Sequence, residues 1–465
     1  MHMKTLVFSA NLALAFIKAK TFQLAPFNPF LPCVRNDQSG NTSAMYQLIA
    51  TFGKTTSLQT LTNSPRRIIN KTIWVLSLVS LFTDTASEML YPVMPVFLKH
   101  IGFSVILIGI LEGVAEAVAG LSKSYFGKLS DTSGKRLPFV RFGYALSAIS
   151  KPMMAAFIFP LWIFLSRTID RMGKGIRTGA RDAMLSDEST EATKGRVFGF
   201  HRSMDTMGAV IGPAIALLYL YYNPADYTTL FLIAFIPGLL AVLSTFLIKE
   251  KNNGDLLKTQ RSQQSETTIS ARSINPVLAF AHYWKKSPYT YKKLVRGLLV
   301  FALFNSSDIF LLLKAKQSGL NDTEVIGLYI FYNLVYALVA FPIGIIADKI
   351  GLKKVLLSGL VLFAIVYTGF AINQAWFFYY VFFALYAVYA AATESISKAW
   401  ITNLVDERDT ATAIGTYSGL QSIAAFIASS LAGLLWYNFG AMATFLITAV
   451  VALGVVVYLA GMKNK

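Results

Sequence analysis

The stretch G-K-L-S-D-T-S-G-K-R at residues 127–136 decides how this chain folds, because it has a counterpart in G-I-I-A-D-K-I-G-L-K-K at residues 344–354. Asp131 and Asp348 hold matching places in the two stretches and lie 217 residues apart. In both stretches glycines flank the aspartate and basic residues follow it, a combination that permits a tight turn and holds it at one side of a membrane. The spacing predicts a chain made of two related halves.

The composition predicts a polytopic membrane protein and excludes an ordinary soluble enzyme. The 465 residues are 55% hydrophobic and only 14% charged, whereas soluble domains carry about 25% charged residues. Apolar runs of about 20 residues recur along the chain, and this length crosses a hydrocarbon core of about 30 Å. We expect twelve helices, at residues 73–98, 103–126, 138–157, 160–186, 196–221, 227–248, 294–315, 322–346, 352–372, 375–404, 411–436 and 441–462.

A second pair of landmarks supports the duplication, since Gly199 and Gly415 are 216 residues apart. Two-domain secondary transporters use internal repeats to build a central site near the membrane midplane. We therefore expect an all-α membrane protein of two pseudo-symmetric six-helix bundles. Its predicted parts are an N-terminal extension that is disordered or a misassigned start (1–71), a first bundle (72–248), a cytoplasmic linker (249–292) and a second bundle (293–465).

The net charge of +18 comes mainly from residues 1–72 and 249–293, which supply 13 of the 18 charges. The basic residues of the other connections also concentrate on one side of the predicted helices, as retention of Lys and Arg in the cytoplasm produces. We therefore expect a multi-pass protein of the plasma (bacterial inner) membrane with both termini cytoplasmic. The charge does not indicate a nucleic-acid binder.

Other classes of site lack the residues they need. Cys33 is the only cysteine, and the four histidines show no metal-ligand spacing. The sequence contains no Walker-type nucleotide loop, no HExxH and no GxSxG motif, so we expect no metal, no cofactor and no enzyme activity. The expected partners are a small-molecule substrate, H⁺ and the lipid bilayer, and we expect a monomer.

The repeated stretch resembles the signature loop of the major facilitator superfamily, G-x-L-x-D-x-x-G-[KR]-[KR], which joins the second and third helices and recurs between the eighth and ninth. The resemblance implies that each aspartate contacts the start of a helix in the opposite half. Asp131 would face the helix that begins near Thr410, and Asp348 the helix that begins near Arg196. The implied gating residues are Gly127, Asp131, Gly134, Lys135, Arg136, Gly344, Asp348, Gly351 and Lys353.

The fifth predicted helix carries Gly208-x-x-x-Gly212-Pro213, which resembles the hinge motif associated with antiporters of this superfamily. The glycine pair that ends that motif is replaced here by Ala216 and Leu217. The difference weakens the assignment to antiporters.

The predicted helix at 160–186 carries charged residues at spacings of three and four, which place them on one face. We expect Arg177, Arg181 and Asp182 to be solvated where this helix leaves the membrane. The residues nearer its middle need a partner or a wet cavity, because a charge at mid-bilayer costs at least ~2.5 kcal/mol. The face comprises Arg167, Asp170, Arg171, Lys174, Arg177 and Arg181.

Polar residues also lie at similar depth in other predicted helices, and the resemblance implies that the first, fourth, seventh and tenth helices line a central cavity. These groups form either a structural ion-pair network or a proton relay and substrate site. The two interpretations overlap, since breaking and remaking such pairs can drive a transport cycle. The candidate pathway is Asp84, Glu88, Glu112, Glu116, Arg167, Asp170, Arg171, Lys174, His201, Arg202, Asp205, Asn305, Asp308, Glu394 and Lys398.

The resemblance implies a secondary active transporter that moves a small solute by alternating access. Within this class the 208–213 motif favours proton-coupled efflux by antiport. The alternative is proton- or exchange-coupled uptake of an organic anion, suggested by Arg167, Arg171 and Lys174. A channel, a sensor or a membrane-embedded enzyme is a distant alternative, and the sequence names neither the substrate nor its charge.

Overall fold

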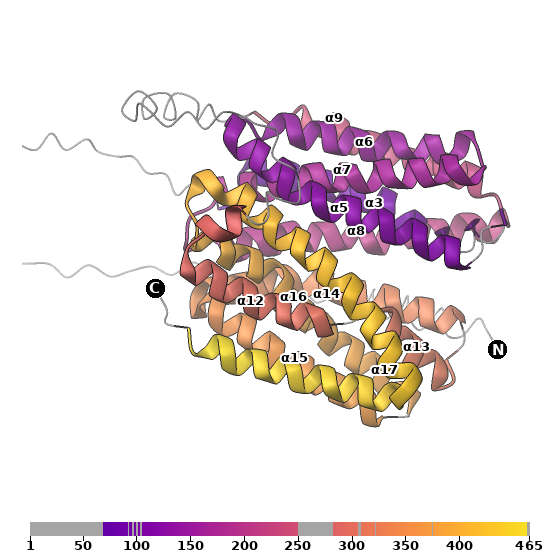
Figure 1. Cartoon of the computed structure of the whole chain (residues 1–465). Coiled ribbons are helices and arrows are strands. Elements are labelled where there is room, and N and C mark those ends of the chain that lie inside the picture. Colours follow the sequence, from indigo (N-terminus) through magenta and orange to yellow (C-terminus); the bar gives the residue numbers. More distant parts are fainter. Residues whose placement is uncertain are drawn as a thin grey trace, which may run out of the picture. The chain divides into compact units, whose positions relative to one another are not determined.

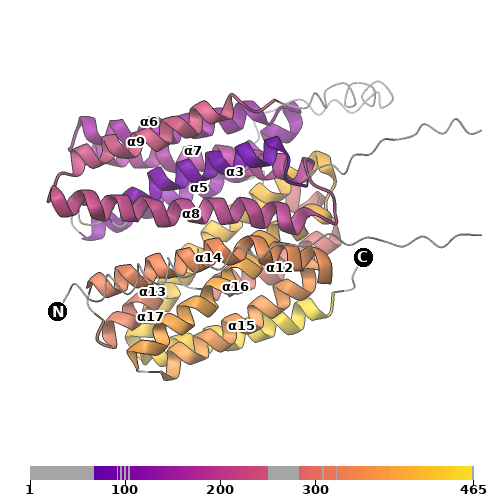
Figure 2. The same ribbon diagram turned by 180° about the vertical axis from the view of Figure 1, so that it is seen from behind.

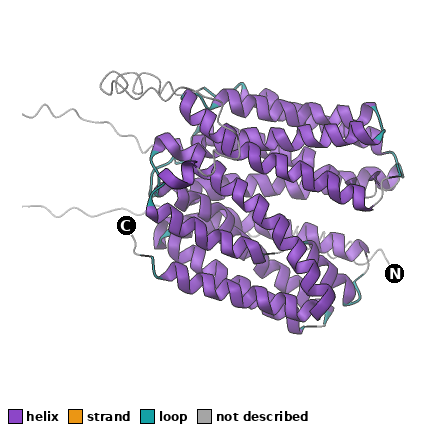
Figure 3. Cartoon of the chain, in the orientation of Figure 1, coloured by secondary structure: helices purple, strands orange, loops and turns teal. Residues whose placement is uncertain are grey.

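The computed structural model describes residues 68–91, 93–94, 97–98, 101–102, 105–249, 282–305, 308–320, 322–373 and 375–462. These residues belong to one compact unit, residues 65–465. Most of the predicted N-terminal extension and most of the predicted linker lie outside the described residues. Within the described ranges the chain is helical and contains no strand (Figure 3). The protein is therefore an all-α membrane protein, as its composition predicts.

The first bundle gathers the helices drawn from indigo to magenta (Figure 1). Within it α3 packs against α8 and α9, α6 packs against α7 and α9, and α5 packs against α7. Most of their ends follow the predicted spans closely, because an apolar run ends at a turn or a charged segment. The exceptions are α3, which ends at Leu90 and not at 98, and α5, which continues to Ser133 and not only to 126. The helices are α3 (Lys71–Leu90), α5 (Val105–Ser133), α6 (Leu137–Ala156), α7 (Pro160–Asp187), α8 (Lys194–Tyr222) and α9 (Tyr227–Thr245).

The second bundle holds the later helices, and Figure 2 shows it from the opposite side. Here α15 packs against α16 and α17, and α14 packs against α16. The elements are α12 (Tyr289–Phe304), α13 (Ile309–Gln317), α14 (Asp322–Ile350), α15 (Leu352–Ile372), α16 (Trp376–Asn403), the short 3₁₀ helix η1 (Glu407–Asp409) and α17 (Thr410–Ala460).

One predicted boundary is wrong in this bundle and another is confirmed. The helix expected at 294–315 is broken into α12 and α13, and Asn305 ends α12 with extended backbone angles. Apolar periodicity does not detect this break, because both sides of it are equally hydrophobic. The two helices expected at 411–436 and 441–462 share the label α17, and the break between them lies at Gly440, whose φ of 78° suits glycine.

Length and apolar composition mark seven of the described helices as able to cross a membrane. Helix α7 is not among them, because charged residues interrupt its apolar sequence. Many large apolar side chains lie on the outer surface, for example Leu161 and Val450, which are 74% and 68% exposed. Such a surface suits contact with lipid, so the charges of α7 need a polar interior.

The two bundles meet where α8 packs against α14 and where α5 packs against α17. Both contacts depend on glycine. A Cβ on Gly344 would overlap the carbonyl oxygen of Gly195, and a Cβ on Gly415 would overlap that of Lys123. The helices therefore approach until their backbones touch, and even a methyl group at either position would hold them apart.

We expect Gly344→Ala to separate α8 from α14 at this contact and to favour conformations in which the bundles are apart there. The added Cβ overlaps backbone that no side-chain rotation can move away. Spin labels introduced by Glu191→Cys and Lys354→Cys, in a Cys33→Ser background, report the distance between the halves. Its distribution should shift to longer values.

The matched control is Gly327→Ala on the same helix, because a Cβ there has no neighbour within 4 Å. This change should leave the label distances as they are and stabilise the helix by roughly 0.5–1 kcal/mol. Equal distance distributions for the two variants would contradict the role given to Gly344.

Candidate functional site

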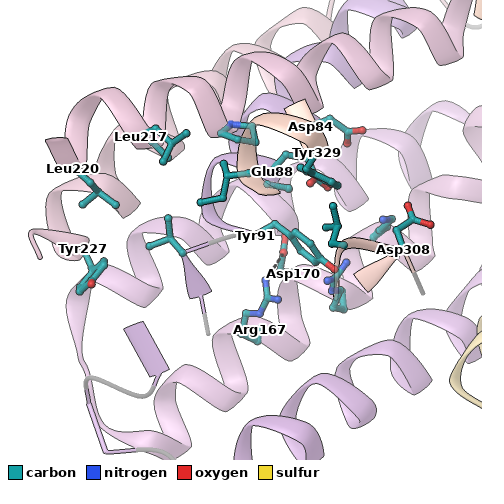
Figure 4. A pocket seen from close by; sticks show the side chains of 18 of the residues that line it. Asp84, Glu88, Tyr91, Arg167, Asp170, Leu217, Leu220, Tyr227, Asp308 and Tyr329 are labelled. Carbon is teal, nitrogen blue, oxygen red and sulfur yellow. Dashed lines mark ion pairs between the residues drawn. The ribbon is translucent and has the colours of Figure 1, made fainter. Parts of the chain in front are cut away.

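A polar cavity lies between the bundles and has two adjoining parts, with volumes of about 750 and 420 Å³. Asp84, Glu88, Lys174, Asp308 and Tyr329 line both parts, so the two are continuous. Figure 4 shows the larger part, with Asp84 and Glu88 on one side and Asp308 on another. It reaches Leu220 and Tyr227, near the helix ends remote from the repeated loops, and the smaller part extends the other way to Lys123 and Lys398.

The predicted charges in the middle of α7 are paired within the first bundle. Lys151 of α6 is 1% exposed, and its Nζ lies 2.8 Å from Oδ1 of Asp170. The same Nζ donates to Ser87 on α3, and Arg167 lies 3.9 Å from the other Asp170 oxygen. Lys151 is absent from the predicted pathway because it is a single charge in an apolar run, and only the packing of α6 on α7 brings it to Asp170.

The expectation that Arg177, Arg181 and Asp182 are solvated is wrong. Arg177 is 4% exposed and Asp182 1% exposed, and Arg181 pairs with Asp182 at 2.9 Å. Lys398 of α16 donates to the second Asp182 oxygen at 2.7 Å. This end of α7 stays inside the protein because the opposite bundle covers it, which a hydropathy pattern does not show.

Arg177 contacts two side chains of α6. Its Nη1 donates to Ser147 at 2.6 Å, and its guanidinium lies 4.6 Å from the centre of the Tyr144 ring. Both contacts turn the cation toward α6, although the side chain also borders the cavity. The prediction did not count Ser147 or Tyr144, since neither carries a charge.

A second network centres on Arg202 of α8, which lies on the cavity wall. It pairs with Asp205 at 2.8 Å, donates to the Tyr336 hydroxyl at 2.7 Å and also pairs with Glu394 of α16. Ser80 of α3 donates to the other Asp205 oxygen. The network therefore joins both halves through one guanidinium.

His201 lies beside this network but does not line either part of the cavity. It is 5% exposed, and Nδ1 lies 3.5 Å from the Ser77 hydroxyl. It lies on the α3 side of α8, against Ser77, and its predicted role stays a prediction.

Glu112 and Glu116 lie on α5, and their side chains fall outside the part of the chain that the structure describes. Their predicted roles stay predictions.

The second bundle faces the cavity with tyrosines and few charges. Tyr386 donates to Asp308 at 2.7 Å, and Tyr329 lines both parts of the cavity. Asn305 lies behind this wall, where its side-chain amide donates to the Tyr389 hydroxyl at 3.3 Å. Tyr386 is not among the predicted pathway residues. The spacings of three and four residues between Tyr329, Tyr332 and Tyr336 place these tyrosines on one face of α14, and this pattern is a signal that the sequence offers.

The two signature aspartates cap helices of the opposite half. Asp131 accepts from the backbone N–H and the hydroxyl of Thr412, at 2.7 and 2.6 Å. Asp348 accepts from the N–H groups of Gly195 and Arg196, at 2.7 and 3.1 Å. A carboxylate at a helix N-terminus gains from the unpaired N–H groups and the dipole. These contacts close the molecule at the end that carries the repeated loops.

Other predicted loop residues support this closure less directly. Arg136 bridges Asp131 and Asp187 at 2.9 and 2.7 Å, whereas Lys353 donates to backbone carbonyls at the end of α17. Gly134 and Gly351 have φ of 66° and 101°, as their turns require.

The predicted hinge motif lies at the contact of α8 with α3. A Cβ on Gly208 would lie 2.5 Å from the carbonyl oxygen of Leu81, and one on Gly212 would lie 2.6 Å from the backbone nitrogen of Met89. Pro213 borders the cavity. The motif therefore brings the backbone of α8 against the helix that carries Asp84 and Glu88.

Two helical bundles that enclose a polar cavity, closed at one end, define a polytopic membrane protein built to hold a small solute. The family model of the major facilitator superfamily matches residues 76–332 and 309–463. The chain belongs to this superfamily. It is a secondary transporter, a multi-pass membrane protein that carries a small-molecule substrate, and not an enzyme.

Individual proteins agree with this assignment. An uncharacterized MFS-type transporter of Methanocaldococcus jannaschii is 31% identical over 380 residues, 80% of this chain and 90% of that protein. The quinolone resistance protein NorA of Staphylococcus aureus is 27% identical over 147 residues, 32% of this chain and 38% of that protein. The solved structure of FucP in the outward conformation has a TM-score of 0.69 at 12% identity, covering 86% of this chain and all of that one.

We expect Lys151→Met to destabilise the first bundle by roughly 3–5 kcal/mol, because it leaves the buried Asp170 without its closest cation. The double variant Lys151→Met with Asp170→Asn should recover most of this loss, since no unpaired carboxylate remains. The thermal midpoint of the purified protein in detergent measures both effects. Lys285→Met, at an exposed position, is the control and should change little. A double variant less stable than the single one would contradict the pairing argument.

Proposed function

We propose that the cavity binds the substrate and that the transporter exports it in exchange for protons. The observation that carries this proposal is that two acidic groups, Asp84 and Asp205, line the same part of the cavity, and that Asp84 packs against Gly208, one turn along α8 from Asp205. Neighbouring carboxylates repel each other, and a proton on one of them relieves the repulsion. Arg202 holds Asp205 as its partner, so Asp84, which faces the cavity, is the group that binds and releases the proton.

Lys174 and Glu88 connect this proton to the substrate. Lys174 is exposed, and it lines both parts of the cavity together with Asp84 and Glu88. Once Asp84 loses its proton, its carboxylate attracts Lys174 or a positive group of the substrate. A proton on Asp84 and a positive group of the substrate in the same cavity therefore disfavour each other, without the substrate having to bind Asp84, and this competition is what an exchange mechanism requires.

Alternating access follows from the contacts at the closed end. Asp131 and Asp348 bind helix N-termini of the opposite half, and we infer that both contacts break when the cavity opens at that end. Each contact is worth about 1–3 kcal/mol, which a ligand can overcome. If the repeated loops are cytoplasmic, as the distribution of Lys and Arg predicts, the structure is open toward the outside.

The same distribution places both termini in the cytoplasm and suits the plasma (bacterial inner) membrane. The cavity is complete within one chain, so a monomer suffices for transport. The net charge of +18 serves membrane orientation in this proposal, and no nucleic-acid partner is needed.

Export is favoured over import by two observations. The similarity to NorA, a quinolone resistance protein, covers 147 residues. The close packing of Gly208 and Gly212 on α3 is the geometry expected of the antiporter hinge. Uptake or exchange of an organic anion is the second candidate, because Arg167, Arg171 and Lys174 all border the larger part of the cavity.

We expect Asp84→Asn to uncouple solute movement from the pH gradient. In proteoliposomes that contain a pH indicator, a panel of small solutes added to one side identifies those that the wild type exchanges for protons. For such a solute the variant should lose gradient-driven flux by about tenfold or more and retain exchange of labelled for unlabelled solute, because the proton site is gone and the cavity remains.

Asp226→Asn is the matched control, since Asp226 is a carboxylate outside the cavity, bonded to Tyr219 at the start of α9. It should transport as the wild type does. Wild-type flux that ignores the pH gradient would overturn proton coupling, and flux that runs only inward down the proton gradient would favour the anion-uptake alternative.

A further inference from the structure

The two bundles present different charges to the larger part of the cavity. Among the described residues, the basic ones that line it come from α7 in the first bundle: Arg167, Arg171, Lys174 and Arg177. The first bundle also contributes the acids Asp84, Glu88 and Asp170, so its described lining residues carry a net charge of +1 when all are ionised. The second bundle contributes one charged residue among the described lining residues, and this residue is the acid Asp308. The two sides of the cavity therefore differ in the sign of their net charge.

The charges of this part balance once Asp84 has lost its proton. Four described acids line it, Asp84, Glu88, Asp170 and Asp308, against the four bases of α7. A ligand that carries a single charge would find one favourable wall and one unfavourable wall. A ligand that carries both charges meets an opposite charge at each end and leaves the cavity neutral.

Not all of these groups are placed to meet a ligand. Asp170 and Arg177 are almost fully buried and bonded to α6. Lys174 is exposed to the cavity, and Asp308 is partly exposed, with one oxygen bonded to Tyr386. Asp84, Glu88 and Arg171 are also partly exposed, but all three belong to the first bundle. A ligand that reaches both bundles therefore meets Lys174, the exposed cation of the first, and Asp308, the acid of the second.

The wall beside Asp308 is apolar and aromatic. Leu312, Val325, Ile326 and the ring of Tyr329 line it. An apolar or aromatic body gains by contact with such a surface. The volume of about 750 Å³ lies within the roughly 300–1,000 Å³ of small-molecule sites.

We infer that the substrate is a zwitterion with an apolar or aromatic body, whose anionic group lies at Lys174 and whose cationic group lies at Asp308. This inference rests on the proposal that the cavity is the substrate site. A zwitterion held in this way touches both bundles, whereas a ligand bound by α7 alone touches one. Binding across the cavity favours conformations in which the halves approach each other at the open end, so the same charges that select the substrate also promote closure.

Equilibrium binding to three molecules of matched shape tests this inference. The zwitterion is para-(aminomethyl)benzoate, the cation is para-methylbenzylamine and the anion is para-ethylbenzoate, each with a biphenyl analogue to vary the span. Binding is measured near neutral pH on the purified transporter by calorimetry and by thermal stabilisation. We expect a zwitterion of one length to bind about tenfold or more tightly than both of its singly charged analogues.

Two variants assign the ends of the ligand. Asp308→Asn keeps a hydrogen-bond acceptor for Tyr386. It should weaken the binding of the zwitterion and of the amine about tenfold and leave the binding of the benzoate unchanged. Lys174→Gln should weaken the binding of the zwitterion and of the benzoate and leave the binding of the amine unchanged. Asp226→Asn and Lys285→Gln are the controls for loss of a charge elsewhere.

Singly charged analogues that bind as tightly as the zwitterion, or no preferential binding of either zwitterion, would overturn the inference. The binding measurement needs no pH gradient, so its result does not depend on whether transport is coupled to protons. If the protein exchanges protons for a simple anion or cation, the proposed function holds and only the inference of a zwitterionic substrate is contradicted.

Discussion

The structure depends on the neutralisation of the charges on α7. A charged group in the hydrocarbon region must find a partner or water, and this helix carries charges along most of its length. Lys151 of α6 meets Asp170, and Lys398 of α16 meets Asp182. These ion pairs bring α6 and α16 against α7 and fix how far along α7 each of them makes contact. The cavity exists because the charged face of α7 has no other acceptable environment.

The closure of one end rests on contacts that are strong and still breakable. Asp131 and Asp348 bind backbone N–H groups at helix starts, and glycine at positions 344 and 415 lets the helices touch. A contact built from a few polar bonds has a defined geometry and can be exchanged for water when the end opens. A large apolar interface would resist such exchange, so polar caps suit the alternation between two states that we propose.

Much of the fold is predictable from the chain, and the candidate site is predictable only in part. The apolar runs locate most helices to within a few residues, because the bilayer thickness imposes their length. The break at Asn305 and the burial of Arg177 are not predictable in this way. Both depend on neighbours distant in the sequence. For the same reason Lys151 was not among the predicted pathway residues, although it forms the closest ion pair to Asp170.

The sequence by itself determined the class of protein, the repeated halves and the residue types of the site, because these follow from composition, period and local motif. Only the tertiary structure decided which charged residues form ion pairs with one another and which face the cavity. Asp170 and Asp182 form buried ion pairs, whereas Lys174 and Asp308 lie at the surface of the cavity. The physical reason is that Coulomb pairing depends on distance in space, and distances between helices arise from packing across the whole molecule.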